Sequence, residues 1–293
     1  MHVAVLGHGS AGSRLAKHLG DLGSEVSVVC RGEAPPDDVD ALVVATPTSA
    51  HREGLELALD RGVHVYLEKP LAAVPDGVAP LLDRADELGL VVAVGYNLRF
   101  HPAIERIQDA VAAGAIGRLL SARAEVGQYL PDWQLGRDYR ESYAARADGG
   151  GGALLTLSHE LDVIRWIGGE IRACRGTVSR ISSLDLDVDD LVELVCRHES
   201  GAVSSVHADF VDRSYNRRQR WVGADGTIAW EWGGDVVLLP SREVLWRDDG
   251  FDVDGTYRFA LADFLAAIER GGRPRCNGRD GLRVVELCEE ARA

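Results

Sequence analysis

The stretch HVAVLGHGSAG, residues 2–12, decides the fold of this chain. Its first five residues are typical of a strand, and the next six fit the pattern G-x-G-x-x-G. This pattern is informative where it follows a strand and opens a helix, as it does here. The first glycine permits a tight turn, the second lets a pyrophosphate approach the backbone, and the third lets the helix pack on the strand. The helix N-terminus then offers free N–H groups to the phosphates. The predicted dinucleotide loop consists of Gly7, Gly9, Ser10, Ala11 and Gly12.

Strands and helices alternate through the first 95 residues. The expected strands are 2–6, 25–30, 41–45, 63–67 and 90–94, and the expected helices are 10–22, 50–61 and 76–88. Such alternation predicts an α/β domain with a parallel, doubly wound sheet.

The pattern changes after about Gly117. Longer segments, several with period-two alternation, follow one another closely, so we expect a large, open and mostly antiparallel sheet in an α+β second domain. The expected strands there are 119–126, 171–181, 191–197, 202–209 and 227–232, and helices are expected at 257–270 and 280–292.

Lysine is rare in this chain. Only Lys17 and Lys69 occur among 32 basic residues. A lysine that escapes such a bias towards arginine is a candidate for chemistry that the permanently charged guanidinium cannot do. Lys69 stands in Glu68-Lys69-Pro70, directly after an apolar run. A charged pair at the end of a buried parallel strand lies where open α/β sheets bind ligands.

Bulk composition excludes several classes of protein. The net charge of −14 and the pI near 5.1 argue against non-specific binding to nucleic acid or to an anionic membrane. No apolar run approaches the roughly 20 residues that span a bilayer, and the chain enters a strand at once, so we expect no signal peptide. The five cysteines show no metal-ligand spacing. We therefore expect reduced thiols, no metal and a cytoplasmic location.

Cofactor choice depends on the end of the second strand. An NAD enzyme usually has an acid there to bind the ribose, whereas this chain has Arg31, which could pair with a 2′-phosphate. Glu33 follows two residues later and could still reach a ribose. NADP is therefore the preferred prediction and NAD the alternative. The third strand ends in small and hydroxyl residues that could line the cofactor, although Ser49 could equally cap the next helix.

These motifs together resemble the Gfo/Idh/MocA family, named after glucose–fructose oxidoreductase and inositol dehydrogenase. The resemblance covers essentially the whole chain and rests on the glycine loop and on residues 45–48, 68–70, 95–100, 149–152 and 278–286. It implies a Rossmann dinucleotide-binding domain at 1–118 and a substrate-binding and oligomerisation domain at 119–293, with the last helix packing back on the first domain. It also implies NAD(P)-dependent hydride transfer to or from a hydroxyl or carbonyl carbon of a sugar, amino sugar or cyclitol, in a biosynthetic role.

The resemblance assigns roles to particular residues. In that family the lysine of E-K-P hydrogen-bonds the reacting oxygen, a role that passes to Lys69. The family also has the helix pattern D-x-x-x-H-x-x-D, which His159 and Asp162 keep, whereas Leu155 stands at the first Asp. His159 is the expected acid/base, and Thr156 would share its helix face. The implied cofactor contacts are Thr46, Pro47, Thr48, His51, Glu68, Lys69 and Asn97, and the implied substrate contacts are Lys69, Arg99, Tyr139, Thr156, His159 and Asp162.

Three features leave alternatives open. The aromatic and polar loop 129–143 suits contact with a sugar or packing between domains. The basic cluster 213–220 could meet an anionic substrate group or be a solvated strand face that balances acidic neighbours. Four tryptophans between 221 and 246 suggest a sheet face that another subunit buries, in a homodimer or homotetramer. Because Leu155 replaces the family's Asp, the alternative function is a nucleotide-binding sensor or partner subunit without turnover.

Overall fold

The computed structural model describes residues 1–133 and 136–292. The chain divides into two compact units, Met1–Phe100 with Val253–Glu286, and His101–Asp252 with Leu287–Ala293. We call them unit 1 and unit 2. The division differs from the expected domains at 1–118 and 119–293, because residues 101–118 belong to unit 2 and most of the C-terminal tail belongs to unit 1.

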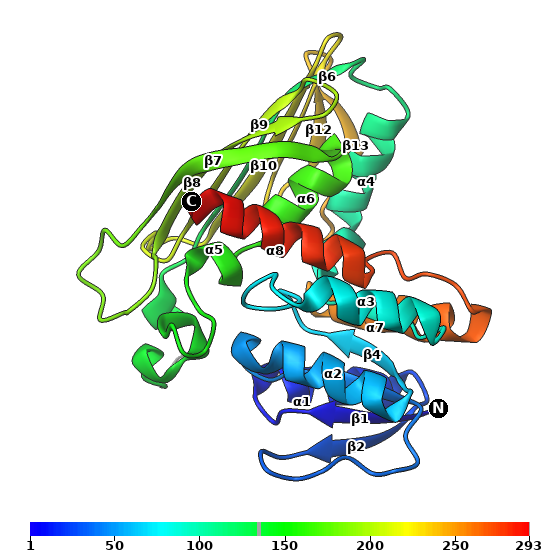
Figure 1. The fold of residues 1–293 in the computed structure, drawn as a ribbon. Helices are drawn as coiled ribbons and strands as arrows, with labels where there is room; N and C mark the ends of the chain where they lie inside the picture. Colours follow the sequence, from blue (N-terminus) through cyan, green and yellow to red (C-terminus); the bar gives the residue numbers. More distant parts are fainter. Residues whose placement is uncertain (134–135, 293) are drawn as a thin grey trace. The chain divides into compact units, whose positions relative to one another are not determined.

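Unit 1 is built on a five-stranded sheet of order β2-β1-β3-β4-β5 (Figure 1). Every neighbouring pair is parallel, which confirms the predicted doubly wound sheet. The strands are β1 His2–Leu6, β2 Glu25–Val29, β3 Ala41–Val44, β4 His64–Leu67 and β5 Val92–Val94. The helices are α1 Ser10–Asp21, α2 His51–Arg61, α3 Val78–Glu87, α7 Asp254–Arg270 and the first part of α8 Gly278–Arg292, with short 3₁₀ turns η1 Thr48–Ala50 and η2 Asn97–Phe100.

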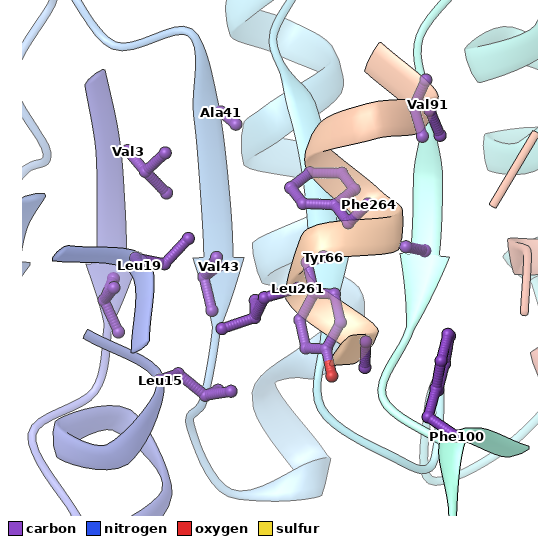
Figure 2. Packing of buried hydrophobic residues seen from close by; sticks show 14 residues of the cluster. Val3, Leu15, Leu19, Ala41, Val43, Tyr66, Val91, Phe100, Leu261 and Phe264 are labelled. Atoms are coloured by element: carbon purple, nitrogen blue, oxygen red, sulfur yellow. The ribbon is translucent and has the colours of Figure 1, made fainter. Parts of the chain in front are cut away.

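Apolar side chains of α1 and α7 form a core with the sheet of unit 1 (Figure 2). Leu261 and Phe264 of α7 are fully buried there, and the Phe264 ring centroid lies 5.8 Å from that of Tyr66 on β4. Burying each such side chain contributes about 1.5–3 kcal/mol. This packing explains why α7, late in the sequence, belongs to the unit formed by the first strands.

Unit 2 is built on an eight-stranded sheet of order β13-β12-β11-β10-β6-β9-β8-β7. All neighbouring pairs are antiparallel except β6 and β9, which confirms the predicted class. The strands are β6 Leu119–Gly127, β7 Ile171–Ser179, β8 Leu191–His198, β9 Val203–Asp209, β10 Asn216–Gly223, β11 Thr227–Glu231, β12 Val236–Leu239 and β13 Glu243–Trp246. The helices are α4 Pro102–Ala112, α5 Ala153–Thr156 and α6 His159–Gly168, with 3₁₀ turns η3 Leu130–Asp132, η4 Tyr139–Glu141 and η5 Tyr143–Ala145.

The tryptophans of unit 2 do not form the exposed face that the sequence suggested. Trp221 and Trp230 are already buried inside the unit. Trp230, Trp232 and Trp246 surround the ring of His101, with centroid separations of 5.4, 5.2 and 6.0 Å. Alternation along β10 and β11 turns Trp221 and Trp230 towards the core rather than outwards.

Among the described residues, no helix is both long and apolar enough to cross a membrane.

Candidate functional site

The glycine loop of unit 1 has the geometry that its sequence predicts. Gly7 has φ of +108°, and a Cβ there would lie 2.5 Å from the Ala45 carbonyl oxygen. A Cβ on Gly12 would collide with the carbonyl oxygen of Gly7. These positions require glycine because the turn between β1 and α1 is tight and the helix lies against it. Gly7 also donates its N–H to the carbonyl of Val29 at 3.1 Å, which joins the ends of β1 and β2.

The start of α1 fits the phosphates of a dinucleotide. A Cβ on Gly9 would meet nothing within 4 Å, so the backbone is open at this point. Gly9 is the N-cap residue. Because no described side chain caps the helix and its first turn holds no acidic residue, the first N–H groups and the positive end of the helix dipole suit a diphosphate.

Glu68 and Lys69 follow β4 at the carboxyl edge of the parallel sheet. The glycine loop follows β1 at the same edge, because parallel strands end together. The Glu68 carboxylate accepts the Lys69 backbone N–H at 3.3 Å through Oε2, while its Oε1 is buried without a hydrogen-bond partner. Burial raises the pKa of Glu68. Among the described residues, the hydroxyl oxygen of Thr46, after β3, is also buried without a hydrogen-bond partner.

The residues after β3 form the short 3₁₀ turn η1, which contains Ser49. Ser49 does not cap α2, although its sequence position allowed that role. Pro47 is the N-cap of η1, Thr48 is buried, and α2 begins at His51 with Ala50 as its uncapped N-cap. His51 is buried, and both ring nitrogens lie at hydrogen-bond distance from backbone carbonyls. Cofactor contact by these residues stays a prediction.

Asn97 and Arg99 of η2 are buried inside unit 1. The Asn97 amide donates to the Thr256 hydroxyl at 2.6 Å. The Arg99 guanidinium donates to the Arg275 carbonyl at 2.8 Å and lies 3.4 Å from the Asp280 carboxylate. These bonds join η2 to α7 and to the start of α8. Cofactor contact by Asn97 and substrate contact by Arg99 are predictions that these bonds neither require nor test.

The end of β2 places two charged residues where the ribose of a dinucleotide is usually bound. Arg31 and Glu33 are both exposed. The Glu33 carboxylate folds back and accepts the Cys30 backbone N–H at 2.9 Å through Oε2. This bond occupies one of the two Glu33 carboxylate oxygens.

The predicted acid/base lies at the start of a helix in unit 2. His159 is the first residue of α6, Asp162 is fully buried one turn later, and Leu155 is buried in α5. The chain leaves helical geometry at Leu157, which has φ of −102°. Thr156 ends α5, so the expectation that it shares a helix face with His159 is wrong. Only His159 and Asp162, which both belong to α6, are three residues apart within one helix.

Contacts from a loop after β7 hold the glycine run and the start of α5. Asp189 accepts the Leu154 N–H at 2.8 Å through its carboxylate and the Ala153 N–H at 2.9 Å through its carbonyl. Gly152 makes room for it, since a Cβ there would lie 2.5 Å from the Asp189 carboxylate. In the same loop Asp185 donates its N–H to the Tyr139 hydroxyl at 3.0 Å. Substrate contact by Tyr139 stays a prediction, and residues 134 and 135 of the aromatic loop lie outside the described residues.

A buried ion pair beside His159 is absent from the sequence-based prediction. Glu160 is fully buried, and its carboxylate accepts two bonds from Arg217, at 2.7 Å from Nε and 3.4 Å from Nη2. Arg217 therefore balances an acidic neighbour from inside the unit. By contrast, Arg218 faces outwards and pairs with Glu125. The alternation along β10 could have predicted the burial of Arg217, because Arg217 and the buried Gln219 are two residues apart and lie on the same face of the strand.

Comparisons with known proteins agree with this geometry. The family profile described as "Oxidoreductase family, NAD-binding Rossmann fold" matches residues 24–96, and that described as "GFO/IDH/MocA C-terminal domain" matches residues 104–229. The chain belongs to the Gfo/Idh/MocA family. It is an oxidoreductase of this family with a nicotinamide dinucleotide cofactor, and both NAD and NADP are compatible with its relatives.

Two curated relatives and one solved structure illustrate the likeness to other Gfo/Idh/MocA proteins. A 1,5-anhydro-D-fructose reductase from Ensifer adhaerens is 31% identical over 84% of this chain and 74% of its own length. A dTDP-3,4-didehydro-2,6-dideoxy-α-D-glucose 3-reductase from Streptomyces violaceoruber is 34% identical over 80% of this chain and 69% of its own. The structure of levoglucosan dehydrogenase in complex with NADH shares the fold, with a TM-score of 0.85, 21% identity and coverage of 99% and 98%.

Proposed function

We propose that this protein transfers hydride between a nicotinamide cofactor and a hydroxyl or carbonyl carbon of a sugar, amino sugar or cyclitol, in a biosynthetic reaction. The observation that carries the proposal is the position of Lys69. It follows β4 at the carboxyl edge of the parallel sheet, on the edge where the glycine loop and α1 offer an open, uncapped phosphate site.

Lys69 supplies the electrostatic part of the proposed reaction. Bound nicotinamide accepts or provides the hydride. Because the reacting oxygen changes between hydroxyl and carbonyl, a proton must move at that oxygen. An ammonium beside the oxygen stabilises the negative charge that develops there, and such preorganised contacts are worth about 3–4 kcal/mol.

His159 is the proposed acid/base. His159 begins α6 directly after residues 157–158, and Ser158 stabilises this turn by donating its hydroxyl to the Leu155 carbonyl at 2.8 Å. Asp162 lies one turn further along α6 and is buried. We assign Asp162 the task of orienting the imidazole, and Thr156 and Tyr139 to contacts with the substrate.

Two observations support a sugar-like substrate. The names of the curated relatives state reduction of an anhydro-sugar and of a nucleotide-linked deoxy-sugar for those proteins. The loop that precedes the glycine run begins with an aromatic residue beside a charged one, since the guanidinium of Arg213, from the turn between β9 and β10, lies 4.1 Å over the Tyr129 ring. Aromatic faces and fixed polar groups are what a sugar site requires.

A substrate panel tests the proposal. Free and nucleotide-linked sugars, amino sugars and cyclitols are mixed with each cofactor, and NAD(P)H absorbance is followed in both directions. The proposal expects turnover with at least one member, abolished in Lys69→Met. Tight cofactor binding without turnover for any member would instead favour the sensor alternative that Leu155 suggests.

We further propose that the protein forms a homodimer or homotetramer through the outer face of the eight-stranded sheet. Val195 on β8 and Val203 on β9 are 52% and 38% exposed on that face, although both lie in interior strands of the sheet. Apolar side chains in the middle of a broad sheet face suit burial by a partner. Light scattering should detect dissociation in Val195→Glu and an unchanged mass in Val74→Glu, which alters a similarly exposed valine of unit 1. An unchanged mass in both would contradict this assembly.

A further inference from the structure

His51 connects the ends of two strands at the candidate site of unit 1. It begins α2, yet its ring reaches back to the backbone on both sides. Nδ1 lies 2.7 Å from the carbonyl oxygen of Pro70, and Nε2 lies 3.0 Å from the carbonyl oxygen of Thr46. Thr46 follows β3 and Pro70 follows β4. One side chain thus bridges the two strand ends at the edge that carries Lys69.

The position of the proton on this ring determines which of the two carbonyls, that of Pro70 or that of Thr46, receives a hydrogen bond. Burial lowers the pKa of His51, and the positive charge of Lys69 lowers this pKa further. The hydrogen bonds to the carbonyls of Pro70 and Thr46 oppose this effect by raising it. A neutral imidazole carries one N–H and can donate to only one of the two oxygens. The shorter contact, to Pro70, is the better place for that hydrogen. The ring is 1% exposed, so losing the bond would leave a buried carbonyl without this donor.

The carbonyl that His51 holds belongs to the residue directly after Lys69. We propose that His51 is a positioning residue for Lys69: its Nδ1–H fixes the carbonyl of Pro70 and thereby the direction in which the lysine side chain leaves the end of β4. The inference rests on the proposed function, in which the Lys69 ammonium contacts the reacting oxygen. A displacement of about 1 Å at a reacting group can cost about 100-fold in rate, so such a support has a catalytic consequence.

His51 is not needed to hold α2 against the sheet, because apolar packing already does this. Leu55, Ala58 and Leu59 of α2 are buried, each with at most 1% of its surface exposed.

His64 at the start of β4 provides a comparison within the same sheet. Its Nδ1 accepts the Val91 N–H at 3.0 Å and stabilises the opposite end of the strand. His64→Gln is therefore the matched control for His51→Gln.

The rarity of lysine gives a test that needs no turnover. Reductive methylation with ¹³C-formaldehyde labels Lys69, Lys17 and the N-terminal amine alone, so each gives a resolvable NMR signal. In His51→Gln we expect the Lys69 signal to move and broaden while that of Lys17, which is 72% exposed on α1, stays in place. In His64→Gln neither should change. An unmoved Lys69 signal in folded His51→Gln would overturn the proposal.

Two further measurements complete the test. In the unmodified protein, ¹⁵N spectra of the imidazoles should show the proton of His51 on Nδ1, and a bare Nδ1 would contradict the proposal even if the variants do not fold. With a substrate, His51→Gln should lower kcat about 10- to 100-fold, and an equal loss in His64→Gln would overturn the proposal. If no substrate is turned over by the wild type, the proposed function fails while both NMR results still decide the role of His51.

Discussion

Replacing Arg217 by methionine should destabilise unit 2 by about 3–5 kcal/mol. The guanidinium makes two bonds to the Glu160 carboxylate, at 2.7 and 3.4 Å, and Glu160 is fully buried. Methionine fills much of the same space but leaves a carboxylate in the interior without its counterion. Breaking one side of a buried pair costs more than the pair itself contributes, because a charge is then desolvated without compensation.

Two further variants separate this effect from lost packing. Arg217→Met with Glu160→Leu removes both charges, so we expect stability within about 1 kcal/mol of wild type. Arg218→Met changes the next residue of β10, whose side chain is 56% exposed and pairs with Glu125. That surface pair should contribute about 0–1 kcal/mol.

Urea unfolding followed by tryptophan fluorescence provides the measurement, since Trp221, Trp230 and Trp232 lie in unit 2. The expected order of stability is wild type, double variant and Arg218→Met close together, with Arg217→Met well below them. A loss under about 1 kcal/mol in Arg217→Met, or a double variant as unstable as the single one, would refute the buried-pair argument.

Charged groups also determine the cofactor preference, the pH dependence of kcat and the pH dependence of stability. NADPH should bind more tightly than NADH by about tenfold, and Arg31→Asp should reverse the order, because Arg31 offers a cation at the end of β2; titration of both cofactors decides this. The kcat profile should lose a pH-dependent step in the range where imidazoles ionise, about pH 6–8, in His159→Asn. Bonds to Asp209 and Glu193 raise the pKa of His207 to about 9 despite partial burial. This contribution to stability is complete below about pH 6.5 and is lost as pH rises through 9, so His207→Gln should flatten stability over that interval.

Local sequence was sufficient for the parallel sheet and the glycine loop. The requirement for glycine at Gly7 comes from the turn that directly follows β1, and Glu68-Lys69 follows a short apolar strand, so each could be placed from its neighbours. β10 was missed because arginines on its outer face and at Arg217 hide its alternation. The break between α5 and α6 was missed because Leu157 gives no signal of a helix end.

Contacts between distant residues were beyond such reasoning. Arg217 and Glu160 are 57 residues apart, and only the fold brings a cation on β10 to the start of α6. The two carbonyl contacts of His51 depend on the register of β3 and β4, which sets where each strand ends. Sequence placed His51 among the cofactor residues without this information.

The proposed function requires that the Lys69 ammonium takes part in hydride transfer. The most direct test is kcat of Lys69→Met beside Lys17→Met, which removes the other lysine of the chain from an exposed pair with Asp21. Methionine keeps the length of the side chain and removes the charge. We predict a kcat at least about 100-fold below wild type for Lys69→Met, with cofactor affinity retained, and a wild-type kcat for Lys17→Met. A wild-type kcat in Lys69→Met would show that the Lys69 ammonium takes no part in hydride transfer.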